Sequence, residues 1–331
     1  MALALAGGVL ASDLAQYHGS NLAPTARYTE LAALNDRFAR RGPALLTDFD
    51  EYALYELRNL DVGGPDFVYP PPRLAALAGG YGQPVVLDRA APRSLSSYPL
   101  IVTRRDPSAS PPPAVYRLLW RGRYYEAWGR VPSAHAARAH VAPADAAGSG
   151  CGAIANLARS AAVSGLRGAR LIAARSPALV RIALASASHP AGWGHRREGL
   201  VLSRPGSLLA DFVLPEAGAW EVWLRGQVMP AIGVSIDGRS LGSVSGQLGG
   251  NSLVPDTISA SVARLSAGRH RLALTRGGFS FAPGSGGSAV LDAIFLAPAA
   301  LAARTLAEVP ARDWRALCGG SYEWLELISA G

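Results

Sequence analysis

Short strand-like segments, some of which alternate between apolar and polar positions, follow one another in the second half of the chain. Such segments run over residues 171–174, 180–185, 199–203, 207–214, 219–225, 231–236, 238–244, 258–265, 268–276 and 289–296. A period of two is typical of a strand with one buried face. Turn signals such as Asp237-Gly238 separate the segments at the spacing of about 8–12 residues that is typical of sandwiches. We therefore predict an antiparallel β-sandwich, a jelly roll, over residues 166–298.

The first 140 residues mix helical and strand patterns. Tyr28, Leu31, Leu34 and Phe38 recur at helical spacing within residues 26–41. A short buried strand at 44–47 and a helix at 52–60 follow, and a strand at 98–103 precedes a hairpin at 116–128. Helix, strand and helix in this order predict a small N-terminal α/β domain over residues 1–140. The fold class is then α+β, with two domains.

The segments that flank the sandwich carry the two cysteines. Residues 132–150 are rich in Ala, His, Pro and Gly and show no period, so we interpret residues 141–165 as a linker, with Cys151 in a helix at 151–164. Residues 299–331 form a tail that packs back, with Cys318 and a strand at 322–328. The cysteines lack CxxC spacing, which argues against a zinc site. They form one disulfide in an oxidising compartment, which we expect, or two buried thiols in a cytosolic protein.

Composition narrows the class of partner. The chain is 49% hydrophobic and only 17% charged, which excludes a disordered chain. It has net charge +8 and no lysine. Its arginines are scattered, with short runs such as Arg104-Arg105 and Arg196-Arg197 in place of a basic stripe. We attribute the arginines to GC-rich coding and expect no nucleic-acid partner.

Residues 1–11 are apolar, and the first basic residue is Arg27. The positively charged region of a signal peptide is therefore missing, and the run is shorter than the about 20 residues of a membrane-spanning helix. Two interpretations stay open. The segment is a buried helix, or residues 1–17 are the end of a membrane helix that begins upstream of Met1.

Five motifs follow one another in the second half. They are Asp211-Phe-Val-Leu-Pro215, Gly218-Ala-Trp-Glu-Val-Trp-Leu224, Val234-Ser-Ile-Asp-Gly238, Ala267-Gly-Arg-His-Arg-Leu272 and Leu291-Asp-Ala-Ile-Phe-Leu296. In this order they resemble the galactose-binding-like jelly roll of carbohydrate-binding modules. The resemblance implies sugar binding, and it puts Asp292 where an acidic residue holds a structural Ca²⁺. The sequence does not identify the first-strand glutamate expected beside it or the other ligands, so the cofactor is either none or this calcium.

Two motifs of the first half resemble another family. Gly42-Pro-Ala-Leu-Leu-Thr-Asp-Phe-Asp-Glu-Tyr52 and Arg121-Gly-Arg-Tyr-Tyr-Glu-Ala-Trp128 are similar to the soluble part of actinobacterial multi-spanning (GT-C-type) membrane glycosyltransferases. The resemblance implies a non-catalytic, extracytoplasmic accessory portion that serves cell-envelope polysaccharide assembly. Its partners would be a glycan or lipid-linked sugar, and the membrane through sequence upstream of Met1. That family's catalytic carboxylates would lie in the membrane part.

Sugar binding needs aromatic faces and planar polar groups. In the loop 189–198, two glycines flank Trp193, so its ring can stand exposed. The candidate residues of this loop are Trp193, His195, Arg196 and Glu198, and a second group comprises Trp223, Arg225, Gln227, Asn251 and Asp256. Trp220 and Trp223 point to opposite faces of a strand, which leaves Trp223 for a concave face. The alternatives are a tryptophan packed on the sandwich edge and ordinary polar turn residues.

Two other function classes stay open. A free-standing glycan-active enzyme would use two of the carboxylates of Asp48, Asp50 and Glu198. The acidic residues Asp48, Asp50 and Glu51 also lie where a strand meets a helix, and there helix capping is the alternative. A structural or interaction module would bind no ligand. No G-x-S-x-G segment lies at the strand-to-helix elbow that a hydrolase needs, and no HExxH motif is present.

Overall fold

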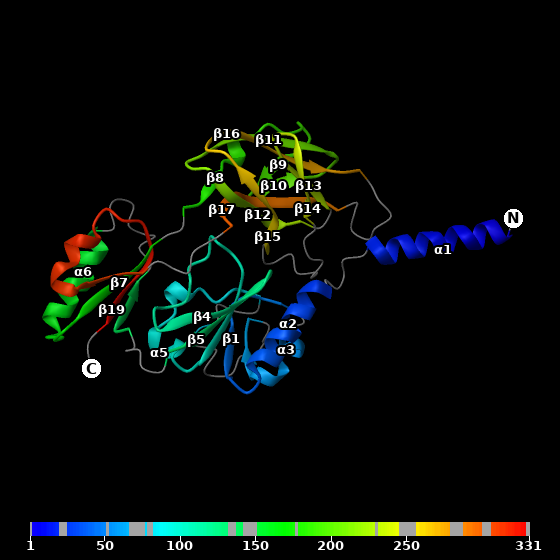
Figure 1. Cartoon of the computed structure of the whole chain (residues 1–331). Coiled ribbons are helices and arrows are strands. Elements are labelled where there is room, and N and C mark those ends of the chain that lie inside the picture. Colours follow the sequence, from blue (N-terminus) through cyan, green and yellow to red (C-terminus); the bar gives the residue numbers. More distant parts are fainter. Residues whose placement is uncertain are drawn as a thin grey trace. The chain divides into compact units, whose positions relative to one another are not determined.

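The computed structural model describes residues 2–19, 25–50, 53–65, 77, 82–131, 137–141, 151–175, 178–228, 231–244, 256–278, 287–299 and 306–328. The chain divides into two compact units (Figure 1). Unit 1 comprises Met1–Thr25 and Ala178–Ala300, and unit 2 comprises Ala26–Pro177 and Leu301–Gly331.

The first part of unit 2 is a mixed five-stranded sheet in the order β2-β1-β3-β5-β4. Its strands are β1 (Ala44–Leu46), β2 (Val62–Gly63), β3 (Leu100–Arg104), β4 (Tyr116–Arg121) and β5 (Tyr125–Arg130). Its helices are α2 (Thr25–Phe38), α3 (Ala53–Glu56), η1 (Arg58–Leu60), η2 (Leu87–Arg89) and α5 (Pro92–Leu95). β1 pairs in parallel with β2 and β3, whereas β5 pairs antiparallel with β3 and β4. Both faces are covered, since Leu46 packs with α2 while Leu45 packs with Tyr98.

The second part of unit 2 is a four-stranded antiparallel sheet in the order β18-β7-β19-β6. Its strands are β6 (Ala139–Val141), β7 (Arg170–Arg175), β18 (Leu306–Pro310) and β19 (Tyr322–Ile328), and its helices are α6 (Cys151–Val163) and η5 (Ala311–Leu317). The predicted disulfide between Cys151 and Cys318 is present, with the two Cα atoms 4.9 Å apart.

This sheet corrects two predictions. The segment around 171–174 was expected in the sandwich, but as β7 it pairs with β18 and β19. Residues 141–165 were expected to be a linker, but α6 buries Ile154, Leu157 and Ala161 in the core beside this sheet. The physical reason is the apolar face of α6, which a linker would leave in water.

A buried polar cluster joins the two sheets of unit 2. Glu326 of β19 accepts a hydrogen bond from the Ala114 amide at 3.1 Å, and its other oxygen lies 2.8 Å from Nδ1 of His140. The second nitrogen of His140 faces Asp88 at 3.6 Å. Burial alone would lower the pKa of His140, but its contacts with Asp88 and Glu326 outweigh burial and raise that pKa.

Unit 1 contains the antiparallel β-sandwich that the alternation predicts. One sheet has the order β15-β12-β17-β10-β9, with β8 also paired to β17, and the other has the order β11-β16-β13-β14. The strands are β8 (Val180–Ile182), β9 (Gly194–Arg196), β10 (Gly199–Leu202), β11 (Gly206–Leu214), β12 (Gly218–Gln227), β13 (Ile232–Ile236), β14 (Arg239–Val244), β15 (Asp256–Leu265), β16 (Gly268–Arg276) and β17 (Ala289–Pro298). Residues of both sheets form one buried core, among them Leu208, Val222 and Leu274.

The sandwich is an insertion within unit 2. β7 and β18, which precede and follow it in the chain, are neighbours in one sheet, with Ala174 opposite Leu306. The sandwich in turn begins and ends with paired strands, since Val180 of β8 lies opposite Leu296 of β17. The chain therefore leaves unit 2 and returns to it at neighbouring backbone positions.

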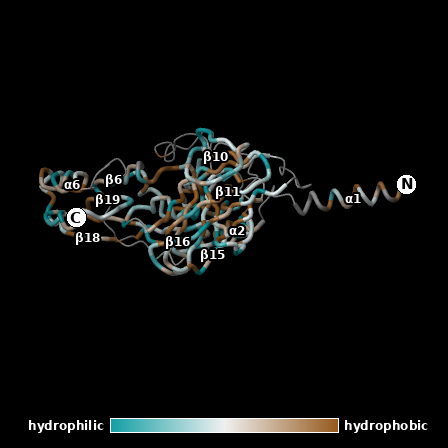
Figure 2. Tube along the Cα trace, turned by 90° about the horizontal axis from the view of Figure 1, so that it is seen from above, coloured by the Kyte–Doolittle hydropathy of each residue, from teal (hydrophilic) through white to brown (hydrophobic). Residues whose placement is uncertain are grey.

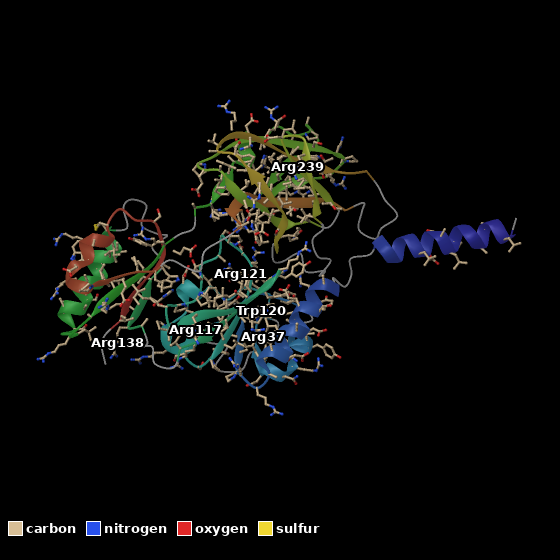
Figure 3. All side chains as sticks on the ribbon, viewed as in Figure 1. Arg37, Arg117, Trp120, Arg121, Arg138 and Arg239 are labelled. Atoms are coloured by element: carbon tan, nitrogen blue, oxygen red, sulfur yellow. A yellow bond between two sulfur atoms is a disulfide. The ribbon has the colours of Figure 1, made fainter. Side chains whose placement is uncertain are left out.

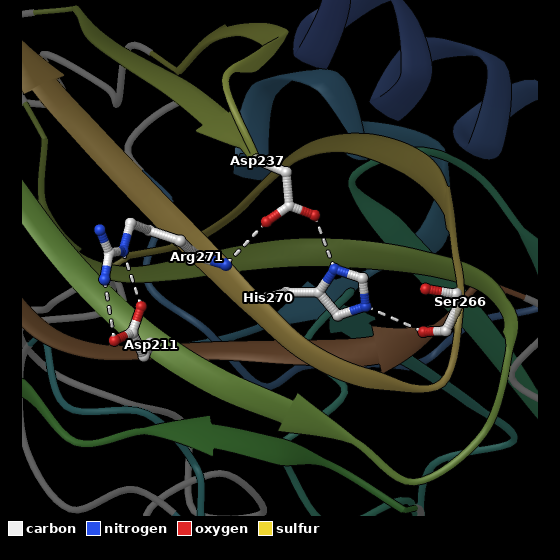
Figure 4. A network of polar contacts seen from close by, with 5 residues as sticks. All are labelled: Asp211, Asp237, Ser266, His270 and Arg271. Carbon is white, nitrogen blue, oxygen red and sulfur yellow. Dashed lines mark hydrogen bonds and ion pairs between the residues drawn. The ribbon is translucent and has the colours of Figure 1, made fainter.

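A polar network fixes the turn between β13 and β14 (Figure 4). Asp237 occupies that turn with φ 51° and accepts hydrogen bonds from Nδ1 of His270 at 2.7 Å and from the Arg271 amide at 2.9 Å. Nε2 of His270 faces the carbonyl oxygen of Ser266 at 2.9 Å. Two acceptors require both ring nitrogens to donate, which favours the imidazolium. The bond to Asp237 accordingly raises the pKa of His270.

The N-terminal segment forms the helix α1 (Ala2–Gly19). Large apolar side chains on this helix are exposed to solvent, at Leu3, Leu5, Val9, Leu10 and Leu14, and Figure 2 shows apolar positions recurring along it. Within the described part of the chain, no helix has the length and apolar character that crossing a membrane requires.

Candidate functional site

The two faces of β12 differ in character. Trp220, Val222 and Leu224 belong to the sandwich core. Because side chains alternate along a strand, Trp223 and Arg225 lie on the opposite face, which we call the outer face of the six-stranded sheet. Trp223 stacks there against Phe295 of the neighbouring strand β17, with ring centroids 6.4 Å apart and an interplanar angle of 4°. The two tryptophans thus point to opposite faces, as their spacing predicts.

The aromatic pair itself is buried, since Trp223 is 1% exposed and Phe295 is fully covered. A sugar ring therefore has no open Trp223 face on which to stack, which corrects the expectation that this ring lines an accessible surface. Polar groups continue the outer face on both sides. Glu221 is buried and accepts a hydrogen bond from Ser259 of β15, while Gln227 is half-buried.

A β-bulge places Asp292 beside Arg225. Arg225 lies opposite Ala293, but the next residue, Gly226, lies opposite Leu291, so Asp292 is the extra residue of β17. A Cβ on Gly226 would lie 2.0 Å from the Val290 carbonyl oxygen, and one on Gly199 of β10 would lie 2.1 Å from that of Leu291. Only glycine permits this close approach on both sides of the bulge. Bulges often re-aim a side chain in this way.

The bulge brings two predicted site residues into direct contact. Nε of Arg225 donates to Oδ2 of Asp292 at 2.6 Å, and the two side chains are 33% and 37% exposed. This ion pair is an accessible part of the outer face. The carboxylate of Asp292 is therefore paired with the guanidinium of Arg225. The described residues include no group of three or more His, Cys, Asp or Glu side chains that could hold a metal ion. The expected calcium ligand is thus an arginine partner in this structure.

Trp193 is placed differently from the sequence-based expectation. Its side chain is 3% exposed and belongs to the sandwich core. The indole Nε1 donates to the carbonyl oxygen of Arg204 at 2.9 Å, and His189 stacks on the ring at 6.2 Å. The expectation of an exposed ring is wrong because the loop continues into a hairpin of β9 and β10, and the indole packs into the sandwich core with its N–H bonded to a backbone carbonyl oxygen.

The remaining candidates of that loop are accessible. His195, Arg196 and Glu198 are exposed at the end of the β9–β10 hairpin. Arg196 lies opposite Gly199, and directly opposed residues share a face, so Arg196 lies on the same outer face as Arg225. In the second group, Asp256 is the first residue of β15, while Asn251 lies outside the described residues.

The acidic residues at the end of β1 are engaged in structure. Asp50 is buried and accepts hydrogen bonds from Arg27 and from the Tyr125 hydroxyl. Asp48 accepts from the Thr47 hydroxyl at 2.6 Å and the Arg104 amide at 3.2 Å, and burial raises its pKa. An Asp50 carboxylate held by a guanidinium and a phenol is a structural anion, which argues against the acid/base pair of an enzyme. Glu51 lies outside the described residues.

Sequence reasoning missed Glu221, Ser259 and Phe295 on the outer face. The signal was present for Glu221, because Glu221 and Trp223 are two apart on one strand and therefore share a face. Phe295 falls in the last strand, where its partner across the sheet depends on register.

Comparisons with known proteins give limited matches. No family model and no curated protein matches the chain. Among solved structures, a CBM36-1 domain of a multidomain xylanase from the hindgut metagenome of Trinervitermes trinervoides is 16% identical, over 37% of this chain and 96% of that one, with a TM-score of 0.28. A family 35 carbohydrate-binding module from Clostridium thermocellum is 14% identical, over 37% and 99%, with a TM-score of 0.28. The C-terminal CBM6 of a marine laminarinase from Zobellia galactanivorans is 16% identical, over 36% and 98%, with a TM-score of 0.27. Scores this low carry no weight for function, and the sandwich rests on the strand pairing above.

Proposed function

We propose that the sandwich binds glycan through the outer face of its six-stranded sheet. The observation that carries the proposal is the partly exposed pair of Arg225 and Asp292, set on a bulge beside the stacked Trp223 and Phe295. A guanidinium and a carboxylate held side by side offer donors and an acceptor to sugar hydroxyls. Gln227, on the same face, adds an amide that can serve both roles.

We further propose that this binding serves cell-envelope polysaccharide assembly, in the extracytoplasmic accessory portion of a membrane glycosyltransferase. The disulfide supports an oxidising compartment. The exposed apolar side chains of α1 support a membrane-facing N-terminal segment. Asp50, held by Arg27 and Tyr125, supports a non-catalytic role for this chain. The glycan is then free or lipid-linked.

Binding is tested by electrophoresis of the whole chain through gels that contain soluble polysaccharides. Binding retards migration, and we expect R225A to abolish the retardation. The matched control is R239A, because Arg239 is an exposed arginine at the start of β14 in the opposite sheet (Figure 3). Equal retardation of R225A and the wild type would rule out the outer face as the site. A wild type that migrates unretarded in every polysaccharide would rule out glycan binding.

The membrane assignment is tested separately by flotation with vesicles of phosphatidylglycerol and phosphatidylethanolamine. The whole chain is expected to float with the vesicles, and a variant that lacks residues 2–19 is expected to stay in the soluble fraction. Equal flotation of the two proteins would contradict a role for α1.

A further inference from the structure

The ion pair on the outer face also defines the class of glycan, and this step rests on the glycan binding proposed above. Arg225 uses only Nε in its bond to Asp292, and Asp292 uses only Oδ2. Within the described part of the chain, neither side chain has another partner. Two terminal nitrogens of the guanidinium and one carboxylate oxygen therefore remain for a ligand, next to one another and partly exposed.

We infer that this pair recognises vicinal hydroxyl groups of an uncharged sugar. A hydroxyl both donates and accepts. One hydroxyl of a vicinal pair can donate to Oδ1 of Asp292 while its neighbour accepts from a terminal N–H of Arg225. Two adjacent hydroxyls on a ring thus face an adjacent acceptor, on Asp292, and donor, on Arg225, so the contact is bidentate. A single hydroxyl uses only half of it.

The same geometry disfavours acidic sugars and phosphates. The charge of Arg225 is neutralised by the carboxylate 2.6 Å from its Nε. An incoming uronate would lie against Asp292, and like charges in contact are repulsive. Asp292 therefore acts as the specificity-determining residue. If the guanidinium of Arg225 had no carboxylate partner, this face would select anions.

The backbone supports this assignment. Gly226 and Gly199 flank the bulge, and a Cβ at either position would overlap a carbonyl oxygen of β17. Arg225 lies opposite Ala293, and regular pairing would continue with Asp292 opposite Gly226. The side chain of Asp292 would then lie on the other face of the sheet from Arg225, whereas the bulge brings it within reach of that arginine. An exposed ion pair contributes little to folding, so the arrangement is better explained by recognition than by stability.

The test uses the whole chain and the same gels. The probes are dextran, galactomannan and arabinogalactan, each before and after periodate oxidation and borohydride reduction, together with polygalacturonate. Periodate cleaves the carbon–carbon bond between vicinal hydroxyls. We expect the wild type to bind at least one neutral probe, to lose at least about tenfold in affinity after oxidation, and to bind polygalacturonate more weakly.

Two variants separate charge from shape. D292N is expected to lose at least about tenfold in affinity for the neutral probe and to gain affinity for polygalacturonate, a gain that salt abolishes. R225Q is expected to lose affinity for the neutral probe and to gain no affinity for polygalacturonate. If oxidised probes bind as well as intact ones, or if the wild type prefers polygalacturonate, the diol assignment is overturned while glycan binding stands. A wild type that binds none of the probes overturns both.

Discussion

Replacement of Trp193 distinguishes a core residue from an exposed sugar platform. The side chain is 3% exposed and donates a hydrogen bond to the Arg204 carbonyl oxygen at 2.9 Å. Truncation of a buried tryptophan to alanine costs about 3–5 kcal/mol. W193F keeps most of the apolar contact but leaves that carbonyl without its donor, so about 1–3 kcal/mol is expected. Against a total stability of about 5–15 kcal/mol, W193A lowers the unfolding midpoint of the sandwich by about 10–25 °C.

The assay is urea and thermal unfolding of the whole chain followed by circular dichroism, with R196A as the control. Arg196 is exposed in the same hairpin, so its removal is expected to change stability by no more than about 0.5 kcal/mol. Glycan binding is measured in parallel and should survive in W193F. If W193A unfolded at the wild-type midpoint while losing glycan affinity, the buried placement would be refuted and the exposed platform reinstated.

Three further predictions concern ionisable groups and the disulfide. The stability of the sandwich should be greatest between the ordinary pKa values of 3.8 for Asp237 and 6.5 for His270. The contribution of His270, whose folded-state pKa is raised, is lost as pH rises through that pKa, and that of Asp237, whose pKa is lowered, is lost as pH falls through its own. In the wild type, the urea midpoint should decrease as pH rises above 6.5 and as pH falls below 3.8. D237N should flatten both slopes, and an unchanged profile would contradict the network. Replacement of Cys151 and Cys318 by serine should destabilise unit 2 by about 2–4 kcal/mol and leave the midpoint of the sandwich unchanged, since both cysteines lie outside it. E326Q should cost unit 2 about 2–4 kcal/mol, because the buried Glu326 binds both His140 and a backbone amide, and a wild-type midpoint would argue against that role.

Strand positions followed from the sequence where one face of a strand is buried. β16 runs over Gly268–Arg276, as its alternation predicts, because every second side chain enters the core. Which strand pairs with which could not be predicted in the same way. β7 shows an ordinary strand pattern, but its neighbours β18 and β19 lie more than a hundred positions later in the chain. Local period carries no information on such pairing, so β7 was assigned to the wrong sheet.

The site shows the same division. Trp223 and Arg225 were found because they lie on a recognisable strand. Asp292 was also found, but as a calcium ligand, since the one-residue register shift at the bulge that turns it toward Arg225 cannot be read from residue types. Trp193 was misplaced for a related reason. The two glycines that flank Trp193 suggested an exposed ring. The ring is instead buried in the sandwich core, and its N–H bonds to the carbonyl oxygen of Arg204.

The insertion of the sandwich between β7 and β18 has a covalent consequence. Cys151 precedes the inserted strands and Cys318 follows them, so the disulfide closes a ring of backbone that contains the whole sandwich. A protease that cuts any loop of the sandwich opens this ring but releases no fragment. The cleaved chain would run as one species on a gel until it is reduced, and only then as two. In a protein outside the cell, the disulfide would therefore keep the two cleaved parts covalently attached after proteolysis of the sandwich.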